Sequence, residues 1–276
     1  QVCAYCIVPK VRGREVSMPL EHLLEKAFQL GSEGVREIVL TGTQLGTYGH
    51  EYPGMGLAEL LKQMCRIPEV ERLRVSSLQA HEITRELMSL WSDSSLCPHF
   101  HIPLQSGSDR VLRSMRRRYT TEQFGAAVGL VREFLPQASI TTDVIVGFPG
   151  ESDEDFQATY RLCEDAGLNK IHVFPYSIRP GTSAAYRDDQ LHTELIRERS
   201  LQLRRLSTKL ERKSRELLVG ETRSVLWESS ELVNGQMTWT GLTEDYVRVS
   251  CATSADLKGV ITLATFLTGD RVSIVQ

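Results

Sequence analysis

The sequence lacks an apolar run long enough to span a membrane, and no charged-then-apolar leader stands at its N-terminus. It also lacks low-complexity stretches, repeats of fixed period and an excess of positive charge. A net charge of -3 over 276 residues argues against a generally basic nucleic-acid-binding protein, although a local basic stripe can still bind a phosphate backbone. We therefore expect a cytoplasmic protein with one large core and a small second domain.

A regular cysteine framework is absent as well. Six cysteines are spread over the chain, and only Cys3 and Cys6 form a short motif, which suits a reducing compartment better than a disulfide scaffold. The other four are expected to be ordinary buried or half-buried thiols without an assigned role: Cys65, Cys97, Cys163 and Cys251.

Up to about residue 190, short apolar runs alternate with longer segments of helical periodicity. Such alternation is typical of strand–helix units that build a parallel sheet. The expected strands are 37–41, 73–76, 99–102, 140–146 and 171–176, and the expected helices are 20–32, 57–66, 83–91, 121–134 and 154–166. With one further strand expected before Cys3, the pattern predicts an α/β fold, with an open partial (β/α)6 barrel over residues 1–190.

The C-terminal part has a different pattern. Residues 191–218 are predicted to form one long connecting helix, whose basic side chains are either solvated or in contact with RNA phosphates: Arg197, Arg199, Arg204, Arg205, Lys209, Arg212, Lys213 and Arg215. After Gly220 the apolar residues recur with period two, and turn residues separate five short segments: 222–227, 237–242, 246–249, 260–266 and 271–275. We expect a small antiparallel β-barrel over residues 219–276.

The pair Cys3 and Cys6 by itself fits three kinds of site: a redox pair, half of a zinc site, or part of an iron–sulfur cluster loop. A redox pair should open a helix, and Ile7-Val8-Pro9 is expected to be a poor helix start. A zinc site needs about four ligands, and the sequence has no second cysteine pair or nearby Cys/His cluster. Both alternatives are therefore weakened, though not eliminated.

The longer phrase Cys3-Ala4-Tyr5-Cys6-Ile7-Val8-Pro9, with Arg12-Gly13-Arg14, resembles the cluster loop of radical S-adenosylmethionine methylthiotransferases. In that family three cysteines in Cys-x3-Cys-x2-Cys order ligate a [4Fe-4S] cluster, and the open iron chelates S-adenosyl-L-methionine. Cys3 and Cys6 match the second and third cysteines, and the first would fall ahead of Gln1. The resemblance thus implies a chain that is truncated at its N-terminus and holds the cluster poorly.

The resemblance continues through phrases that follow the expected strands. In the family, the loop 41–49 meets the methionyl end of the cofactor, which implies cofactor contacts by Thr41, Gly42, Thr43 and Gln44. The phrase 101–108 implies that Gln105 and Ser106 point into the barrel mouth, while His101 is expected to have a structural role.

Two later phrases complete the cofactor side. Residues 143–151 resemble the strand and loop under the adenine and ribose, with Gly147 giving close backbone approach and Asp143 a polar contact. Residues 174–182 close the last unit as in the family, and Arg179 is expected to contact a cofactor carboxylate or a substrate phosphate, or else to lie on the surface.

The family resemblance implies methylthiolation of an unactivated carbon, and the phrase 41–49 looks most like the branch acting on N6-threonylcarbamoyladenosine in tRNA, at C2 beside the anticodon. Isopentenyladenosine in tRNA and an aspartate of a ribosomal protein are the other branches. The implied partners are tRNA, which the basic run 113–118 fits, and an electron donor such as flavodoxin or ferredoxin. A second [4Fe-4S] cluster is expected in an N-terminal domain that this chain lacks, so the fragment should be inactive alone.

The terminal strands resemble the TRAM domain, an RNA-binding barrel of these enzymes. Here the segment from Gly220 holds more acidic than basic residues, so its charge does not support RNA binding by the barrel unaided. A hypothesis from another class is a non-catalytic RNA-binding protein with a decayed (β/α) barrel.

Overall fold

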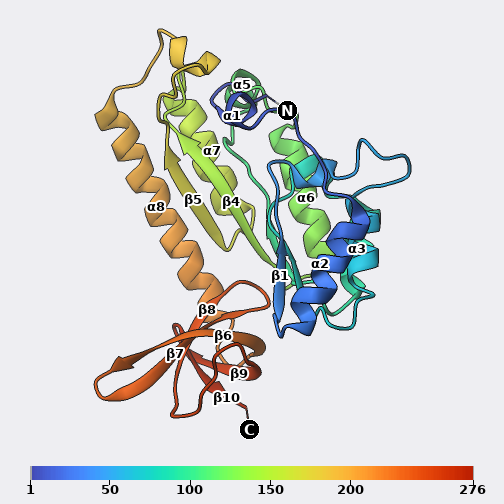
Figure 1. Cartoon of the computed structure of the whole chain (residues 1–276). Helices are drawn as coiled ribbons and strands as arrows, with labels where there is room; N and C mark the ends of the chain where they lie inside the picture. The colour runs from blue at the N-terminus through green and yellow to red at the C-terminus, as the bar shows by residue number, and fades with distance from the viewer. Residues whose placement is uncertain (1, 276) are drawn as a thin grey trace.

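The computed structural model describes residues 2–275, which fold into a curved α/β part and a small β-barrel at the far end of one long helix (Figure 1). Five parallel strands form the α/β part: β1 (Glu37–Leu40), β2 (Arg72–Val75), β3 (His99–His101), β4 (Ser139–Val146) and β5 (Lys170–Pro175). β1 pairs with β2, and β3, β4 and β5 pair in chain order. A parallel bridge from Leu73 to Leu96 sets the segment before β3 beside β2, and the open partial barrel is confirmed.

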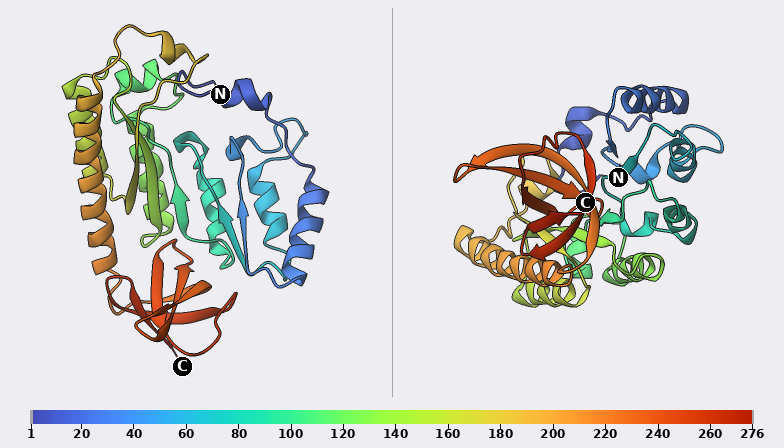
Figure 2. Two further views of the ribbon diagram at one scale, coloured as in Figure 1. Left: turned by 60° about the vertical axis from the view of Figure 1, so that its left-hand side comes forward. Right: turned by 90° about the horizontal axis from the view of Figure 1, so that it is seen from below.

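Helices lie along the outer side of this curved sheet (Figure 2). They are α2 (Leu20–Ser32), α3 (Leu57–Met64), α4 (Arg85–Met88), α6 (Thr121–Phe134), α7 (Asp153–Asp165) and α8 (Thr193–Glu216). Capping boxes fix the starts of α6 and α7. The Thr120 and Ser152 hydroxyls each accept from the third backbone amide of the helix, and their own backbone amides donate to the side chains of Gln123 and Asp155. Within residues 2–275 no helix is long and apolar enough to cross a membrane.

Three helical predictions need correction. The segment after Cys6 was expected to be a poor helix start, yet α1 (Val8–Arg12) begins there, because proline in the first turn has no amide hydrogen bond to lose. A short helix, α5 (Asp109–Ser114), was not expected, and the Ser108 side chain caps it. The expected helix 83–91 divides into α4 and the 3-10 turn Ser89–Ser92.

One apolar core fills the space between the sheet and the outer helices. Leu73 of β2, Val144 of β4 and Ile102, which directly follows β3, pack with Phe124 of α6 and Leu203 of α8, and each is almost fully buried. Because apolar residues recur at three- and four-residue spacing on these helices, one face of each reaches the sheet. Cys97 and Cys163 are buried, and the thiols outside the short motif are free, as expected.

The C-terminal strands close into a barrel in the order β10-β8-β7-β6-β9. Their bounds are β6 (Thr222–Val233), β7 (Gln236–Thr243), β8 (Arg248–Ala252), β9 (Ile261–Thr268) and β10 (Arg271–Ile274). Four pairings are antiparallel, but β10 meets β8 in parallel at Arg271 and Ser250, so the barrel is not wholly antiparallel. It has its own core around Trp227 and Phe266.

Buried charge joins the barrel to the amino ends of the sheet strands. Arg74 pairs with Glu37 at 2.7 Å and donates to the Glu244 carbonyl oxygen at 2.9 Å. The Tyr246 ring stacks on His99, with centroids 4.4 Å apart, and Arg74 lies over the same ring. Only 2% of Arg74 is exposed, so this junction is a fixed interface between the two parts.

We predict that Arg74→Ala destabilises the protein by about 3 kcal/mol, because it leaves the buried Glu37 carboxylate without its closest partner. The matched control is Arg36→Ala, which breaks the exposed Arg36–Glu71 pair and should cost less than about 1 kcal/mol. Urea denaturation of both variants measures the difference, and equal losses would contradict a junction held by buried charge.

Candidate functional site

The cysteine turn is fixed at the carboxyl end of the sheet by the residue after Cys3. The Ala4 amide donates to the Met115 carbonyl oxygen at 2.9 Å, and the Ala4 carbonyl oxygen accepts from the Ala184 amide at 2.9 Å. Ala4 is only 5% exposed, because it packs in a small apolar cluster with Val111 and Met115 at α5 and Ala184 after β5. Figure 1 shows this end of the chain beside α1 and α5.

Both thiols of the turn are free and half-buried. The Cys6 amide donates to the Cys3 carbonyl oxygen at 3.2 Å, so the two residues lie on one tight turn. Tyr5 between them packs edge-on against Phe148, in the loop after β4, with ring centroids 6.4 Å apart. Burial raises the pKa of the Tyr5 phenol, which keeps it neutral near pH 7.

Arg117 is a site residue that the sequence analysis did not single out. Its guanidinium donates to Cys3 Sγ at 3.2 Å, to Gln79 Oε1 at 3.3 Å and to Tyr119 Oη at 3.1 Å. Burial opposes its charge, but the attraction of Tyr119, Tyr5 and Cys3 outweighs this effect and raises the Arg117 pKa. A permanent cation therefore lies against one sulfur of the turn.

The basic run 113–118 thus divides by burial. Met115 and Tyr119 are buried, Arg117 between them is half-buried, and Arg116 and Arg118 are exposed. Met115 ends α5 and Arg116 has φ 60, so the chain turns here and no regular period in the sequence distinguishes Arg117 from its neighbours.

The loop after β1 holds four of the predicted cofactor residues at the carboxyl end of that strand. A cavity of about 300 Å³ beside it is lined by Thr41, Gly42, Thr43 and Gln44 together with residues 15–18. Gly46 lies so close to Glu82 that a Cβ there would be 2.1 Å from the carboxylate carbon. The Glu82 carboxylate, whose pKa burial raises, accepts from the Gln79 amide within the segment after β2 and packs against Gly46 of the loop after β1.

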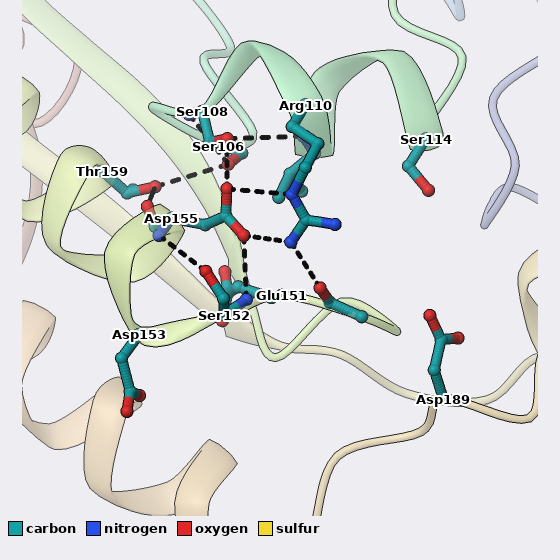
Figure 3. Close-up of polar contacts among 12 residues, drawn as sticks. Ser106, Ser108, Arg110, Ser114, Glu151, Ser152, Asp153, Asp155, Thr159 and Asp189 are labelled. Carbon is teal, nitrogen blue, oxygen red and sulfur yellow. Dashed lines mark hydrogen bonds and ion pairs between the residues drawn. The ribbon is translucent and has the colours of Figure 1, made fainter.

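The segment after β3 continues the pairing with β4 beyond the strand end. Gln105 is 8% exposed and has φ 66; its amide donates to the Asp143 carbonyl oxygen at 2.7 Å, and its carbonyl accepts from Ile145. Ser106 was expected to face the barrel mouth, and this is wrong. Its hydroxyl is buried against Thr159 of α7 and accepts from the Ser108 amide (Figure 3).

Polar side chains from three strands meet on the inner side of the sheet. His101 lies 2.9 Å from Thr141 Oγ1 through Nδ1 and 3.2 Å from Asp143 Oδ2 through Nε2. The His172 ring is 5.7 Å from that of His101, and burial lowers the His172 pKa although Asp143 acts in the opposite direction. His101 therefore has the structural partners that were expected, and it orients the Asp143 carboxylate.

Gly147 allows a close approach of α8 to the loop after β4. It has φ 77, and a Cβ there would lie 2.4 Å from Cγ1 of Ile196 on α8. Its amide donates to Glu151 Oε2 at 2.9 Å, and the same carboxylate pairs with buried Arg199 at 2.7 Å. The glycine therefore has a packing role against α8, and its approach to the cofactor stays a prediction.

The Asp155 carboxylate joins the loop after β4 to the loop after β3. Asp155 accepts from Ser108 Oγ at 2.6 Å and from the Ser152 amide at 2.8 Å, and it pairs with Arg110 (Figure 3). Burial would raise the pKa of Asp155, but the hydrogen bonds from Arg110 and Ser108 outweigh it and hold the pKa below its ordinary range. Both loops are therefore rigidly placed beside the cysteine turn.

Two further predictions concern cations at the surface. Arg179 is exposed in the loop after β5, where its carbonyl oxygen accepts from the Thr182 hydroxyl. On α8, several basic side chains are engaged within the chain, with Arg199 on Glu151, Lys209 on Glu164, Arg212 on Glu216 and Arg215 on Glu211. The first two pairs join this helix to the loop after β4 and to α7, and the last two lie within the helix itself.

Comparison with known families decides the class of the site. The family model of the radical SAM superfamily matches residues 1–163, more than half of the chain. This chain belongs to the radical SAM superfamily.

Curated relatives of this radical SAM chain modify tRNA according to their names. Threonylcarbamoyladenosine tRNA methylthiotransferase MtaB of Chlamydia pneumoniae is 40% identical over 251 residues, 90% of this chain and 58% of the relative. MtaB of Bacillus subtilis is 37% identical, with coverage of 94% and 58%. A tRNA-2-methylthio-N(6)-dimethylallyladenosine synthase of Acetivibrio thermocellus is 36% identical, with coverage of 93% and 54%. The radical SAM chain thus spans a little more than half the length of these relatives.

Solved structures support the same fold at low identity. Coproporphyrinogen III oxidase HemN of Escherichia coli superposes with a TM-score of 0.54 at 14% identity, covering 76% of this chain and 50% of that one. The radical S-adenosylmethionine methyltransferase TsrM of Kitasatospora setae gives 0.56 at 17% identity, covering 67% and 36%. Both similarities concern the radical SAM fold alone.

The superfamily implies a [4Fe-4S] cluster and S-adenosyl-L-methionine, and the residues of this radical SAM chain fit them in part. Cys3 and Cys6 supply two soft sulfur donors on one turn, with a cation against Cys3. Within residues 2–275, no group of three or more His, Cys, Asp or Glu side chains gathers as a metal site. The chain therefore presents two of the three thiolate positions that the family uses.

We predict that Gly147→Ala destabilises this radical SAM chain more than Gly167→Ala does. Both glycines have positive φ, which costs a non-glycine residue about 1–2 kcal/mol, but a Cβ at Gly167 meets no atom within 4 Å. At Gly147 the clash with Ile196 should add about 1–3 kcal/mol. Chemical denaturation compares the two, and Ile196→Ala should relieve part of the larger loss; equal losses would show that the contact with α8 is unimportant.

Proposed function

We propose that this chain is the radical-generating part of a tRNA methylthiotransferase that modifies C2 of N6-threonylcarbamoyladenosine. The observation that supports this most directly is the Cys3–Cys6 turn, held by Ala4 at the carboxyl end of the sheet, in a chain whose relatives are named for this reaction. A decayed, non-catalytic barrel would have no reason to keep two free thiols at this position.

In the proposed enzyme, Cys3 and Cys6 would hold a [4Fe-4S] cluster together with a third cysteine. Such a cluster, when bound and reduced, would supply the electron for reductive cleavage of S-adenosyl-L-methionine. The chain's own residues would bind and orient the cofactor. The loop 41–44 offers backbone groups and hydroxyls beside a cavity, and the inner carboxylate of Asp143 is aimed by His101.

A radical is needed because the adenine C2–H bond has no acidic proton for a general base to remove. The loops after β3 and β4, joined by Asp155, give the site a fixed frame for such a reactive species. Rigid placement of this kind is what a reaction requires when the attacking atom must meet one specific hydrogen.

The substrate branch rests on the phrase 41–49 and on the names of two relatives. The isopentenyladenosine branch is the second candidate, because relatives named as dimethylallyladenosine synthases are nearly as similar, at 36–38% identity. The proposal includes tRNA as partner, a flavodoxin or ferredoxin as electron donor, a second cluster in an N-terminal domain, and a cytoplasmic location.

The test is mass analysis of nucleosides from digested tRNA of a strain that lacks the gene. We expect the 2-methylthio form of N6-threonylcarbamoyladenosine to disappear and its unmodified precursor to accumulate. The wild-type gene should restore the mark, and a Cys6→Ala gene should not. Retention of the mark would contradict the proposal, and loss of the methylthio group from isopentenyladenosine instead would favour the second candidate.

A further inference from the structure

Arg117 makes the contact that carries a further inference. Its guanidinium reaches Cys3 Sγ at 3.2 Å, and two other acceptors hold it in that direction. Gln79 Oε1 accepts at 3.3 Å from the loop after β2, and Tyr119 Oη accepts at 3.1 Å. Tyr119 itself donates to the Pro103 carbonyl oxygen at 2.6 Å, so its phenol is also fixed.

This arrangement uses the shape of a guanidinium. Three acceptors in different directions match a planar fork of N–H donors, whereas a lysine ammonium would satisfy them less well. The guanidinium carbon of Arg117 also lies over the Tyr119 ring, 4.8 Å from its centroid. The side chain therefore has one well-defined orientation, which brings it to the sulfur.

Arg117 makes no close ion pair among the described residues. The Glu82 carboxylate acts on it only from a longer range, and the guanidinium donates its hydrogen bonds to Cys3 Sγ, Gln79 Oε1 and Tyr119 Oη. The neighbouring Arg110 is different, because it pairs with Asp155. A half-buried cation that no carboxylate contacts directly is best accounted for by an anionic group at the sulfur.

We propose that Arg117 is a positioning residue that donates a hydrogen bond to the Cys3 sulfur and thereby raises the reduction potential of the iron–sulfur cluster bound there. The inference rests on the proposed function. One-electron reduction adds negative charge to the cluster and its thiolates, and a charged donor at a ligand sulfur stabilises the reduced state more than the oxidised state. Loss of that donor makes the cluster harder to reduce.

The experiment is a potentiometric titration, followed by electron paramagnetic resonance, of the whole protein reconstituted anaerobically and without S-adenosyl-L-methionine. Arg117→Gln removes the charge but keeps a polar side chain. Arg118→Gln is the matched control, since Arg118 is exposed and one residue away. We expect the midpoint potential of Arg117→Gln to move to a more negative value while that of Arg118→Gln stays at the wild-type value.

An unchanged midpoint in Arg117→Gln overturns the inference while leaving the proposed function intact. A parallel sample with added S-adenosyl-L-methionine measures cofactor binding. An unchanged midpoint with weakened binding there also overturns the inference and assigns Arg117 to the cofactor carboxylate instead. If Arg117→Gln takes up no cluster, Arg117→Lys is titrated instead. Its midpoint potential should still be more negative than that of the wild type, and a wild-type midpoint overturns the inference. Wild-type protein that takes up no iron and sulfide overturns the proposed function together with this inference.

Discussion

The two backbone hydrogen bonds of Ala4 are the constraint on which the site depends. One joins the cysteine turn to the end of α5, and the other joins it to the loop after β5, so a short segment near the N-terminus is bound to parts of the chain more than 100 residues away. Because Ala4 is buried, these bonds are protected from water and hold the turn in place. The two thiols consequently lie at the same edge of the sheet as the loops that follow the strands.

The loops around that turn are fixed by side chains rather than by long elements of structure. Glu82, held within the segment after β2, packs against Gly46 of the loop after β1, and Asp155 joins the loop after β3 to the one after β4 by hydrogen bonds. At the opposite edge, Arg74 and Tyr246 join the barrel to the amino ends of the strands. The barrel therefore covers the amino ends of the strands, and the candidate site lies at their carboxyl ends.

Apolar periodicity was sufficient to predict most elements, because α2 and α6 begin and end at the expected residues and the expected core strands differ by only a residue or two. Family phrases placed the loops correctly along the chain. Neither the periodicity nor the family phrases could show which way a side chain points. Ser106, which follows Gln105 with its positive φ, lies against Thr159 of α7, and Gly147 leaves room for Ile196. Arg117 was hidden in a basic run because charge alone does not show which side chain is buried.

The central claim is that the Cys3–Cys6 turn is part of an iron–sulfur cluster loop, and the most direct measurement is iron and acid-labile sulfide content with electron paramagnetic resonance on the anaerobically reconstituted whole protein. The account predicts a reduced [4Fe-4S] signal that shifts when S-adenosyl-L-methionine is added and that is lost when Cys3 and Cys6 are both replaced by Ala. Bound zinc, or a cluster signal that survives that replacement, would contradict it.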